Sequence, residues 1–140
     1  MALLINASFA METCVFCQII KGDEPAHKIW ESDDFLAFLS IHPVNPGHVC
    51  LIPKTHVDYA FDLEEPLYSE IFRAAKRLAE PIKRATSAKR IGIAVEGFAV
   101  PHVHLHLVPL FNSSELDPHR HIKQTQEELA EMAAKIRKEF

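Results

Sequence analysis

Cysteine is scarce in this chain of 140 residues, and neither sign of charge dominates it. The 3 cysteines are an odd number, which does not suit a disulfide framework and fits free thiols or a metal site in a reducing compartment. The formal net charge is −4 and the basic residues are scattered, so the composition gives no reason to expect a nucleic acid partner. We therefore expect a cytoplasmic protein that does not bind nucleic acid.

Long apolar runs are also missing. No run approaches the roughly 20 residues that a membrane-spanning helix needs. Residues 1–7 are apolar but lack the basic start of a signal peptide. The sequence contains no internal repeat and no low-complexity linker, and its 48% of hydrophobic residues are enough for one buried core. These features predict a single domain over residues 1–140 that has no membrane partner.

The most distinctive stretch is residues 101–109, which read Pro-His-Val-His-Leu-His-Leu-Val-Pro. Successive side chains of a β-strand point to opposite faces. The alternation therefore predicts a strand with His102, His104 and His106 on one face and the apolar residues on the other. A proline at each end is expected to mark the limits of this strand.

A row of three imidazoles has three interpretations. The rings could be solvated or hydrogen-bonded without further function, although strict alternation disfavours this. They could bind a metal, because neutral imidazole is the commonest metal ligand. They could also form a phosphate site, in which one ring attacks phosphorus and its neighbours bind the oxygens. A pKa of about 6.5 lets histidine supply both the neutral nucleophile and the charged donor near neutral pH.

The remaining pattern predicts an α+β fold with a mainly antiparallel sheet, a long helix and a C-terminal helix. The strands are grouped and do not alternate with crossover helices, which argues against a doubly wound fold. Asp62 is the expected N-cap of the long helix, and Pro81 is expected to kink it or to end its regular part. The predicted elements are a helix over 14–21, strands over 28–32, 35–39, 48–53 and 90–95, and helices over 62–85 and 125–138.

The histidine run resembles the signature of the histidine triad (HIT) family, which reads His, apolar, His, apolar, His, apolar, apolar. Residues 14–22, 35–38 and 43–48, followed by 52–54, resemble the amino-terminal half of the Hint-like bacterial members. The motifs occur in the same order over residues 12–110. The resemblance implies a HIT-like fold and a homodimer whose two half-sheets join into one antiparallel sheet.

The resemblance also implies an activity. Members bind purine nucleotides and hydrolyse or transfer them at the α-phosphate, with nucleoside phosphoramidates, adenylates or dinucleoside polyphosphates as candidate substrates. By this likeness His104 is the nucleophile and forms a nucleotidyl-histidine intermediate. His106 would donate hydrogen bonds to the phosphate oxygens, and His102 would orient the site or assist the leaving group.

The resemblance assigns the nucleotide pocket to the first half of the chain. Phe16, Ile19 and Ile41 match positions that enclose the base, although the pattern alone favours ordinary core packing for these residues. Ser40 stands where relatives often carry an aspartate or asparagine for the ribose hydroxyls. His48 is a candidate for the phosphate end of this pocket.

Cys14 and Cys17 form a Cys-x-x-Cys motif, which is half of a zinc site or a redox pair. The motif resembles the arrangement in Hint-like bacterial members, in which histidines complete such a zinc site. We therefore expect a structural Zn²⁺ on Cys14, Cys17, His48 and His102. The rival interpretation is two reduced thiols, with His48 in the phosphate pocket.

The chain departs from the family pattern in the loop before the histidine run. Residues 95–100 contain none of the amide or hydroxyl side chains that relatives place there, which keeps open a second hypothesis: a zinc-stabilised nucleotide-binding or protein-interaction module with little turnover. Four further histidines match no catalytic position and are expected to be solvated surface groups. These are His42, His56, His119 and His121.

Overall fold

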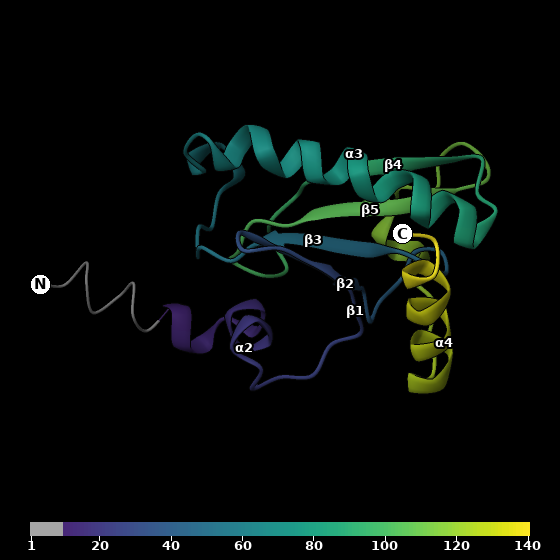
Figure 1. Ribbon diagram of the computed structural model, residues 1–140, viewed down its shortest axis with the longest axis horizontal. Helices are drawn as coiled ribbons and strands as arrows, with labels where there is room; N and C mark the ends of the chain where they lie inside the picture. The colour runs from purple at the N-terminus through teal and green to yellow at the C-terminus, as the bar shows by residue number, and fades with distance from the viewer. Residues whose placement is uncertain (1–9) are drawn as a thin grey trace, which may run out of the picture.

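The computed structural model describes residues 10–140 and contains one five-stranded antiparallel sheet in the order β1-β2-β3-β5-β4 (Figure 1). The apolar residues 1–7 lie outside the described part of the chain. The strands are β1 (Lys28–Glu31), β2 (Phe35–Leu39), β3 (Val49–Pro53), β4 (Arg90–Ala94) and β5 (Leu105–Leu110). The helices are α2 (Val15–Lys21), α3 (Leu67–Thr86) and α4 (Gln126–Arg137), with short 3-10 turns η1 (Ala60–Asp62) and η2 (Pro118–Arg120). The α+β fold is confirmed.

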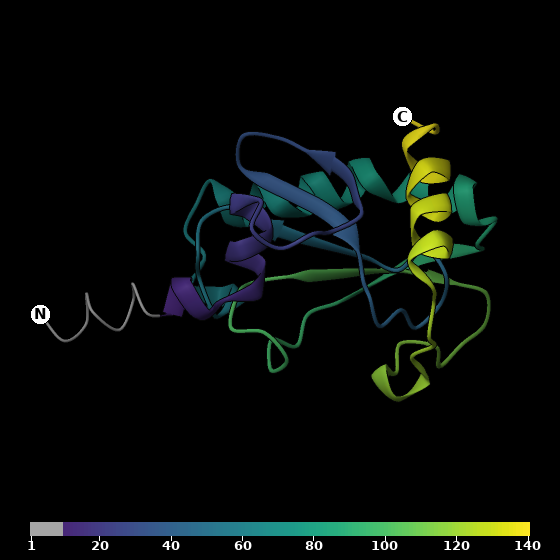
Figure 2. The ribbon, with the colours of Figure 1, turned by 90° about the horizontal axis from the view of Figure 1, so that it is seen from below.

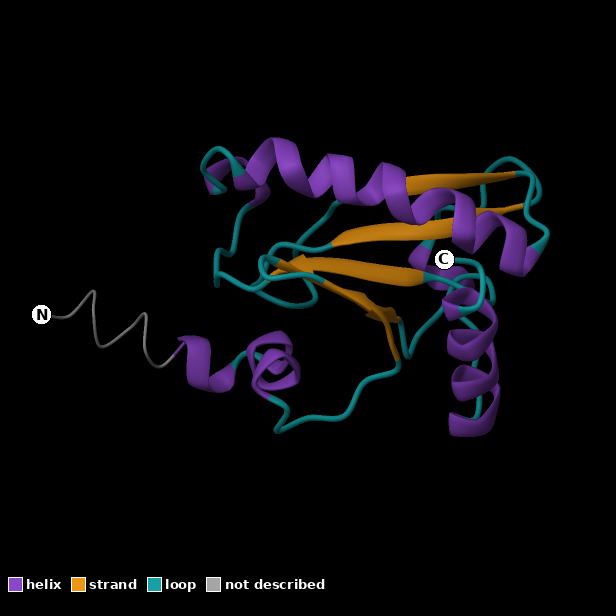
Figure 3. Cartoon of the chain, viewed as in Figure 1, coloured by secondary structure: helices purple, strands orange, loops and turns teal. Residues whose placement is uncertain are grey.

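The sheet separates two layers of helices. In Figures 1 and 3, α3 lies on one side of the sheet and α2 on the other, while α4 stands at one end. Strand alternation supplies a separate apolar face to each side. Ala37, Leu39 and Leu51 belong to the core beneath α3 and α4, whereas Leu36 and Ile52 belong to a smaller core beneath α2. The central strands are therefore buried on both faces.

The turn over residues 43–47 is tied to the end of β5 and to the end of α3. The Asn45 side chain donates a hydrogen bond to the carbonyl oxygen of Pro109 at 2.7 Å. Gly47 adopts a φ of 90°, and a Cβ atom there would collide with the Thr86 side chain and lie 3.3 Å from Pro109. Only glycine meets both demands, and the next residue, His48, is held in a fixed position directly before β3.

The histidine run is strand in its second half only. β5 begins at Leu105, because the preceding amides bond to loops: His102 N–H donates to Val100 O at 2.8 Å, and Val103 N–H donates to Val57 O at 2.7 Å. Pro109 lies inside β5, paired with β4 alone beyond the end of the β3 ladder. The prediction of one strand over the whole run is thus wrong for its first residues.

The long helix also differs from the prediction at both ends. It begins at Leu67, and the expected cap Asp62 ends the separate turn η1. It does not end at Pro81 but continues to Thr86. Pro81 lies on the buried face with Leu78 and Ile82, where packing offsets the hydrogen bond that proline cannot make. Among residues 10–140, no helix is long and apolar enough to cross a bilayer.

We expect Gly47→Ala to lower the free energy of unfolding by well over 1 kcal/mol. Gly97→Ala is the matched control, because Gly97 has a φ of 88° but no atom near the added Cβ. The control should show only the backbone cost of about 1 kcal/mol for a left-handed alanine. Urea unfolding measures both variants, and equal losses would show that the contact between Gly47 and Thr86 is unimportant.

Candidate active site and metal centre

The three histidines of the run lie on the face of the sheet that α2 covers. Figure 2 shows the green segment that leads into β5 passing beside α2. His102 and His104 are buried and His106 is partly buried. The Phe16 ring of α2 meets His102 and His104 edge-on, with centroids 5.9 and 5.1 Å apart. The helix therefore excludes water from the two rings at the start of the run.

One hydrogen bond fixes the tautomer of His104. Its Nδ1 lies 2.6 Å from the carbonyl oxygen of His102. A carbonyl only accepts, so Nδ1 carries the proton and Nε2 of the neutral ring carries a lone pair. Burial lowers the pKa of His104 below its usual value, and the hydrogen bond to His102 partly opposes this. The ring is therefore neutral near pH 7, with its lone pair on Nε2.

A second chain of hydrogen bonds sets the proton of His106. The Val44 N–H donates to Nδ1 of His48 at 3.0 Å, so His48 carries its proton on Nε2. That proton is donated to Nδ1 of His106 at 2.9 Å. His106 consequently carries its own proton on Nε2. Its ring lies beside His104, with centroids 4.9 Å apart, so a donor stands next to a lone pair.

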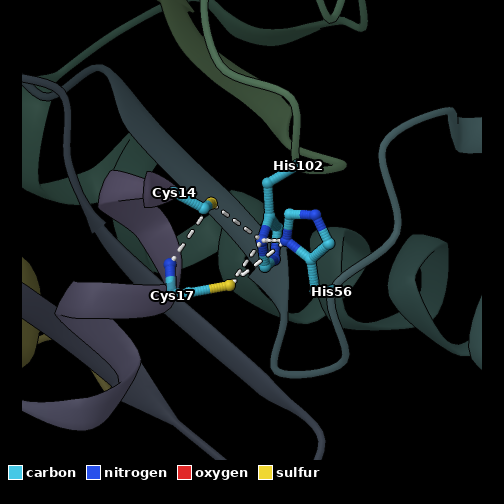
Figure 4. Close-up of side chains that lie close together, drawn as sticks. All are labelled: Cys14, Cys17, His56 and His102. Carbon is cyan, nitrogen blue, oxygen red and sulfur yellow. Dashed lines mark hydrogen bonds between the residues drawn. The ribbon is translucent and has the colours of Figure 1, made fainter. Parts of the chain in front are cut away.

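The His102 ring points toward Cys14 and Cys17 at the start of α2 (Figure 4). Its Nε2 lies 2.8 Å from the carbonyl oxygen of Pro53, which places the proton on Nε2 and a lone pair on Nδ1. Nδ1 faces Cys14 Sγ at 3.4 Å and Cys17 Sγ at 3.6 Å. A ring held by a carbonyl in this way is a typical metal ligand.

His56 completes the group around His102. Its Nδ1 lies 3.2 Å from Cys17 Sγ and 3.2 Å from His102 Nδ1. In a tetrahedral zinc site, bonds of about 2.0 Å to nitrogen and 2.3 Å to sulfur place two nitrogens about 3.3 Å apart and a sulfur about 3.5 Å from a nitrogen. The four separations given above, between 3.2 and 3.6 Å, are close to these values. Cys14, Cys17, His56 and His102 therefore form a set of donors that fits Zn²⁺.

The Cys17 thiol does not readily ionise in the absence of a cation. Burial raises the pKa of Cys17 to about 12, and the neighbouring Cys14 adds to this rise. A divalent cation between the sulfurs would favour both thiolates and reverse the effect. The chemistry of the donors thus agrees with their geometry.

The expected ligand set is corrected at one position. The structure does not bring His48 to the cysteines, and the prediction that His56 is a solvated surface group is wrong. His48 precedes the first residue of β3, whereas His56 follows its last residue, so the two lie near opposite ends of the strand. The pairing of Leu51 with Leu105 directs the end of β3 toward His102. This register is the signal that could have identified His56.

A second group of donors does not suit a metal. His48, Cys50 and His106 bring nitrogen and sulfur atoms close together. However, the Val44 N–H occupies Nδ1 of His48, which leaves a proton on the Nε2 atom that would have to bind the ion. These residues therefore fit a hydrogen-bonded relay better than a metal site.

The predicted base-binding residues lie on the same side as the histidines but differ in exposure. Phe16 and Ile19 are buried in the core beneath α2, while Ile41 is 62% exposed after β2. The Ser40 hydroxyl oxygen accepts a hydrogen bond from the His42 N–H at 3.2 Å. Glu96 is exposed in the loop before the histidine run. His42, His119 and His121 are exposed elsewhere in the chain, so the prediction that they are surface groups is confirmed.

Fold and site together define a small α+β protein in which a histidine with a lone pair on Nε2 lies beside a histidine with a proton on Nε2. The HIT domain family profile matches residues 21–113. Protein hit of Bacillus subtilis is 33% identical over 111 residues, covering 74% of this chain and 75% of the relative. The chain therefore belongs to the HIT family.

Two further relatives are named for an activity or a metal. Adenosine 5′-monophosphoramidase HNT1 of Saccharomyces cerevisiae is 36% identical over 97 residues, covering 69% of this chain and 61% of the relative. A Zn-bound histidine triad family protein from Mycobacterium smegmatis superimposes with a TM-score of 0.78 at 30% identity, covering 92% of this chain and 94% of the other.

The buried relay predicts a loss of stability in acid. Burial lowers the pKa of His48 to about 3 and that of His106 to about 4, with neighbouring histidines adding to both shifts. An unfolded histidine titrates near 6.5. Between about pH 6.5 and 4 the unfolded chain thus binds more protons than the folded protein. The free energy of unfolding therefore falls as the pH falls, by about 1.4 kcal/mol per pH unit for each such histidine.

Urea unfolding from pH 7 to pH 4.5 measures this dependence. His106→Gln should give a shallower pH dependence than the wild type, because one buried neutral ring is lost. His121→Gln, at an exposed site, should leave the slope unchanged. Three identical slopes would contradict the assignment of neutral, buried rings.

Proposed function

We propose that this protein hydrolyses or transfers purine nucleotides at the α-phosphate, with His104 as the nucleophile. The observation that supports this most strongly is the hydrogen bond from His104 Nδ1 to the His102 carbonyl oxygen, which leaves the lone pair on Nε2. The histidine triad relative named as an adenosine 5′-monophosphoramidase favours nucleoside phosphoramidates as substrates. Adenylates and dinucleoside polyphosphates share the same α-phosphorus chemistry.

In the proposed first step, Nε2 of His104 forms a bond to the α-phosphorus while the bond from phosphorus to the leaving group breaks. The leaving group departs with the electron pair and takes up a proton. In the second step, water attacks the nucleotidyl-histidine, gives a proton to solvent and returns the electron pair to Nε2. The product is a nucleoside monophosphate.

The neighbouring residues have supporting roles in this proposal. The proton on Nε2 of His106 is donated to a non-bridging phosphate oxygen, and His48 holds His106 in the tautomer that can donate. His102 acts through its backbone carbonyl, which orients His104. Its ring is turned toward the cysteines and is not assigned to the leaving group.

We further propose that the base lies between the α2 residues Phe16 and Ile19 and the exposed Ile41. Ser40 lies next to Ile41, where its hydroxyl can take one ribose hydroxyl. One hydroxyl group cannot accept hydrogen bonds from both ribose hydroxyls as a carboxylate does, so we expect the ribose to be bound weakly.

The proposed metal is a structural Zn²⁺ held by Cys14, Cys17, His56 and His102. When bound, it would supply a link between α2, the segment after β3 and the start of the histidine run. Because His102 also carries the carbonyl that orients His104, the ion would steady the nucleophile without touching substrate. The free thiols and the metal suit a reducing compartment such as the cytoplasm.

The proposed homodimer forms through β4. This strand lies at the edge of the sheet, and its outer side exposes Ile93, while Val95 is exposed just beyond its end. An exposed apolar edge readily adds another strand. Pairing of β4 with its copy would join two half-sheets into one.

Adenosine 5′-phosphoramidate is the substrate of choice for testing the activity, with AMP release as the readout. His104→Ala should lower kcat/KM by about 1,000-fold or more, because it removes the attacking atom. His121→Ala is the matched control at an exposed histidine and should retain the wild-type rate. If wild type were as inert as His104→Ala while still binding AMP, the protein would be a nucleotide-binding module with little turnover.

Metal analysis of protein purified without added zinc tests the metal centre. We expect one zinc per chain, absent from His56→Ala and retained by His48→Ala. Chelation should lower the Tm of the wild type by about 10 °C, because a ligand at 100 times its Kd adds about 2.7 kcal/mol. Zinc loss in His48→Ala with retention in His56→Ala would restore the originally expected ligand set.

A further inference from the structure

The edge strand β4 has two chemically different faces (Figure 1). Its register with β5 places Ile93 opposite Leu107, which belongs to the core beneath α3, and Ala94 opposite His106. Residues directly opposite each other in a sheet point to the same face, as do residues two apart on one strand. Arg90 therefore points to the face that carries the histidines, which we call the histidine face.

Glu96 belongs to the same alternation as Arg90. Residues 95 and 96 form neither helix nor turn after the end of β4, so the alternation of the strand places the Glu96 side chain on the histidine face. Because Ala94 lies opposite His106, Glu96 lies on the side of His104. Its exposed carboxylate is thus at the rim of the proposed active site, where it would repel a phosphate.

Arg90 and Glu96 are both exposed, and neither forms an ion pair within residues 10–140. Glu115 lines the same hollow as Arg90, but two backbone amides donate hydrogen bonds to its carboxylate and Arg120 pairs with it. Two opposite charges therefore stand without an ion-pair partner on one face of an edge strand.

A second copy of the chain offers a partner to both charges. A two-fold axis perpendicular to the sheet pairs β4 with its copy in antiparallel fashion and keeps both histidine faces on one side. Such a pairing is centred on a residue, because opposite residues must share a face. When the centre is Ile93, Ile91 lies opposite the partner's Val95, and Arg90 lies opposite the partner's Glu96. The symmetry forms each of these pairs twice.

The neighbouring registers lose the charge pairs. A pairing centred on Gly92 places Arg90 opposite the partner's Ala94, and one centred on Ala94 places Arg90 opposite the partner's Phe98. In neither register does Arg90 meet a carboxylate. Opposite charges stabilise a cross-strand pair, and a matching pattern of charged and apolar residues fixes the register. The residues of this edge therefore favour the register centred on Ile93.

We propose that two copies pair through β4 in this register and that Arg90 of the partner subunit neutralises Glu96 at the rim of each active site. Adjacent strands lie about 4.8 Å apart, so a row from His104 through Glu96 to the partner's Arg90 spans about 10 Å. The guanidinium offsets the carboxylate that would otherwise repel the phosphate of a nucleotide. Each site is then complete only in the dimer, and this inference rests on the proposed function.

Charge reversal tests the register by complementation. Arg90→Glu sets like charges opposite each other in both pairs, and Glu96→Arg does the same, so each variant should dimerise about 30-fold more weakly than the wild type. An equimolar mixture of the two variants should form a heterodimer as tight as the wild-type dimer, because every acidic residue of the pairs then faces a basic one. Sedimentation velocity measures these equilibria.

Matched controls show whether the effect belongs to this edge. Glu131→Arg and Lys135→Glu reverse charges at exposed positions of α4. Each control should dimerise like the wild type, and their mixture should show no preference for heterodimers. Thermal unfolding confirms that every variant is folded.

Neutral variants test the role at the active site at protein concentrations above the dimer Kd. Arg90→Gln leaves the apolar pairs in place but no longer offsets Glu96, so KM for adenosine 5′-phosphoramidate should rise about fivefold with little change in kcat. Arg90→Gln/Glu96→Gln should return KM to the wild-type value, because the carboxylate is gone as well. A purely structural role of Arg90 would not give this rescue.

Three results would overturn the proposal: a wild type that is monomeric, a mixture of the two reversed variants that forms no heterodimer, or an unchanged KM in Arg90→Gln. A wild type that releases no AMP would instead contradict the proposed hydrolysis. In that case sedimentation still decides the register, and the Kd for AMP replaces KM as the measure of the rim charge.

Discussion

The contact on which this site depends is the 2.6 Å hydrogen bond between Nδ1 of His104 and the carbonyl oxygen of His102. It decides where the proton of a buried, neutral imidazole sits and therefore which nitrogen can attack. The carbonyl is available because the run is not yet paired as a strand at this point, and its amides bond to loop carbonyls instead. Strand pairing beginning at Leu105 then holds the following residues in line. The irregular start of the run is thus part of the chemistry.

His48, His102, His104 and His106 differ in which ring nitrogen carries the proton, because each has different hydrogen-bond partners. A carbonyl leaves the lone pair of His104 on Nε2 and that of His102 on Nδ1, whereas an amide and His48 leave a proton on Nε2 of His106. Chemically identical side chains thereby become suited to the three roles proposed for them: nucleophile, metal ligand and hydrogen-bond donor. His102 places its carbonyl oxygen against His104 and its ring against Cys14 and Cys17, so the proposed metal centre and the proposed nucleophile share one residue.

Much of the fold could be predicted from the sequence, because the relevant patterns are local. The continuous apolar runs of β2 and β3 and the apolar stripe of α3 each reflect which side chains can be buried. The partners at the site were harder to predict. Finding His56 beside Cys17 requires the register of β3 against β5, and the tautomers depend on the amide of Val44 and the carbonyl of Pro53, which carry no residue-type signal. The lack of a strand at His102 likewise results from two backbone hydrogen bonds. His102 N–H donates to Val100 O, close in the sequence, whereas Val103 N–H donates to Val57 O, far away in the sequence.

The most direct test of this account is the protonation state of His104 itself, measured at neutral pH by ¹⁵N NMR of histidine-labelled protein, with His104→Gln used to assign the signal. The account predicts a neutral ring with a protonated Nδ1 and an unprotonated Nε2. A ring protonated on Nε2, or one that is charged at pH 7, would contradict it, because neither has the lone pair on Nε2 that the proposed attack on phosphorus requires.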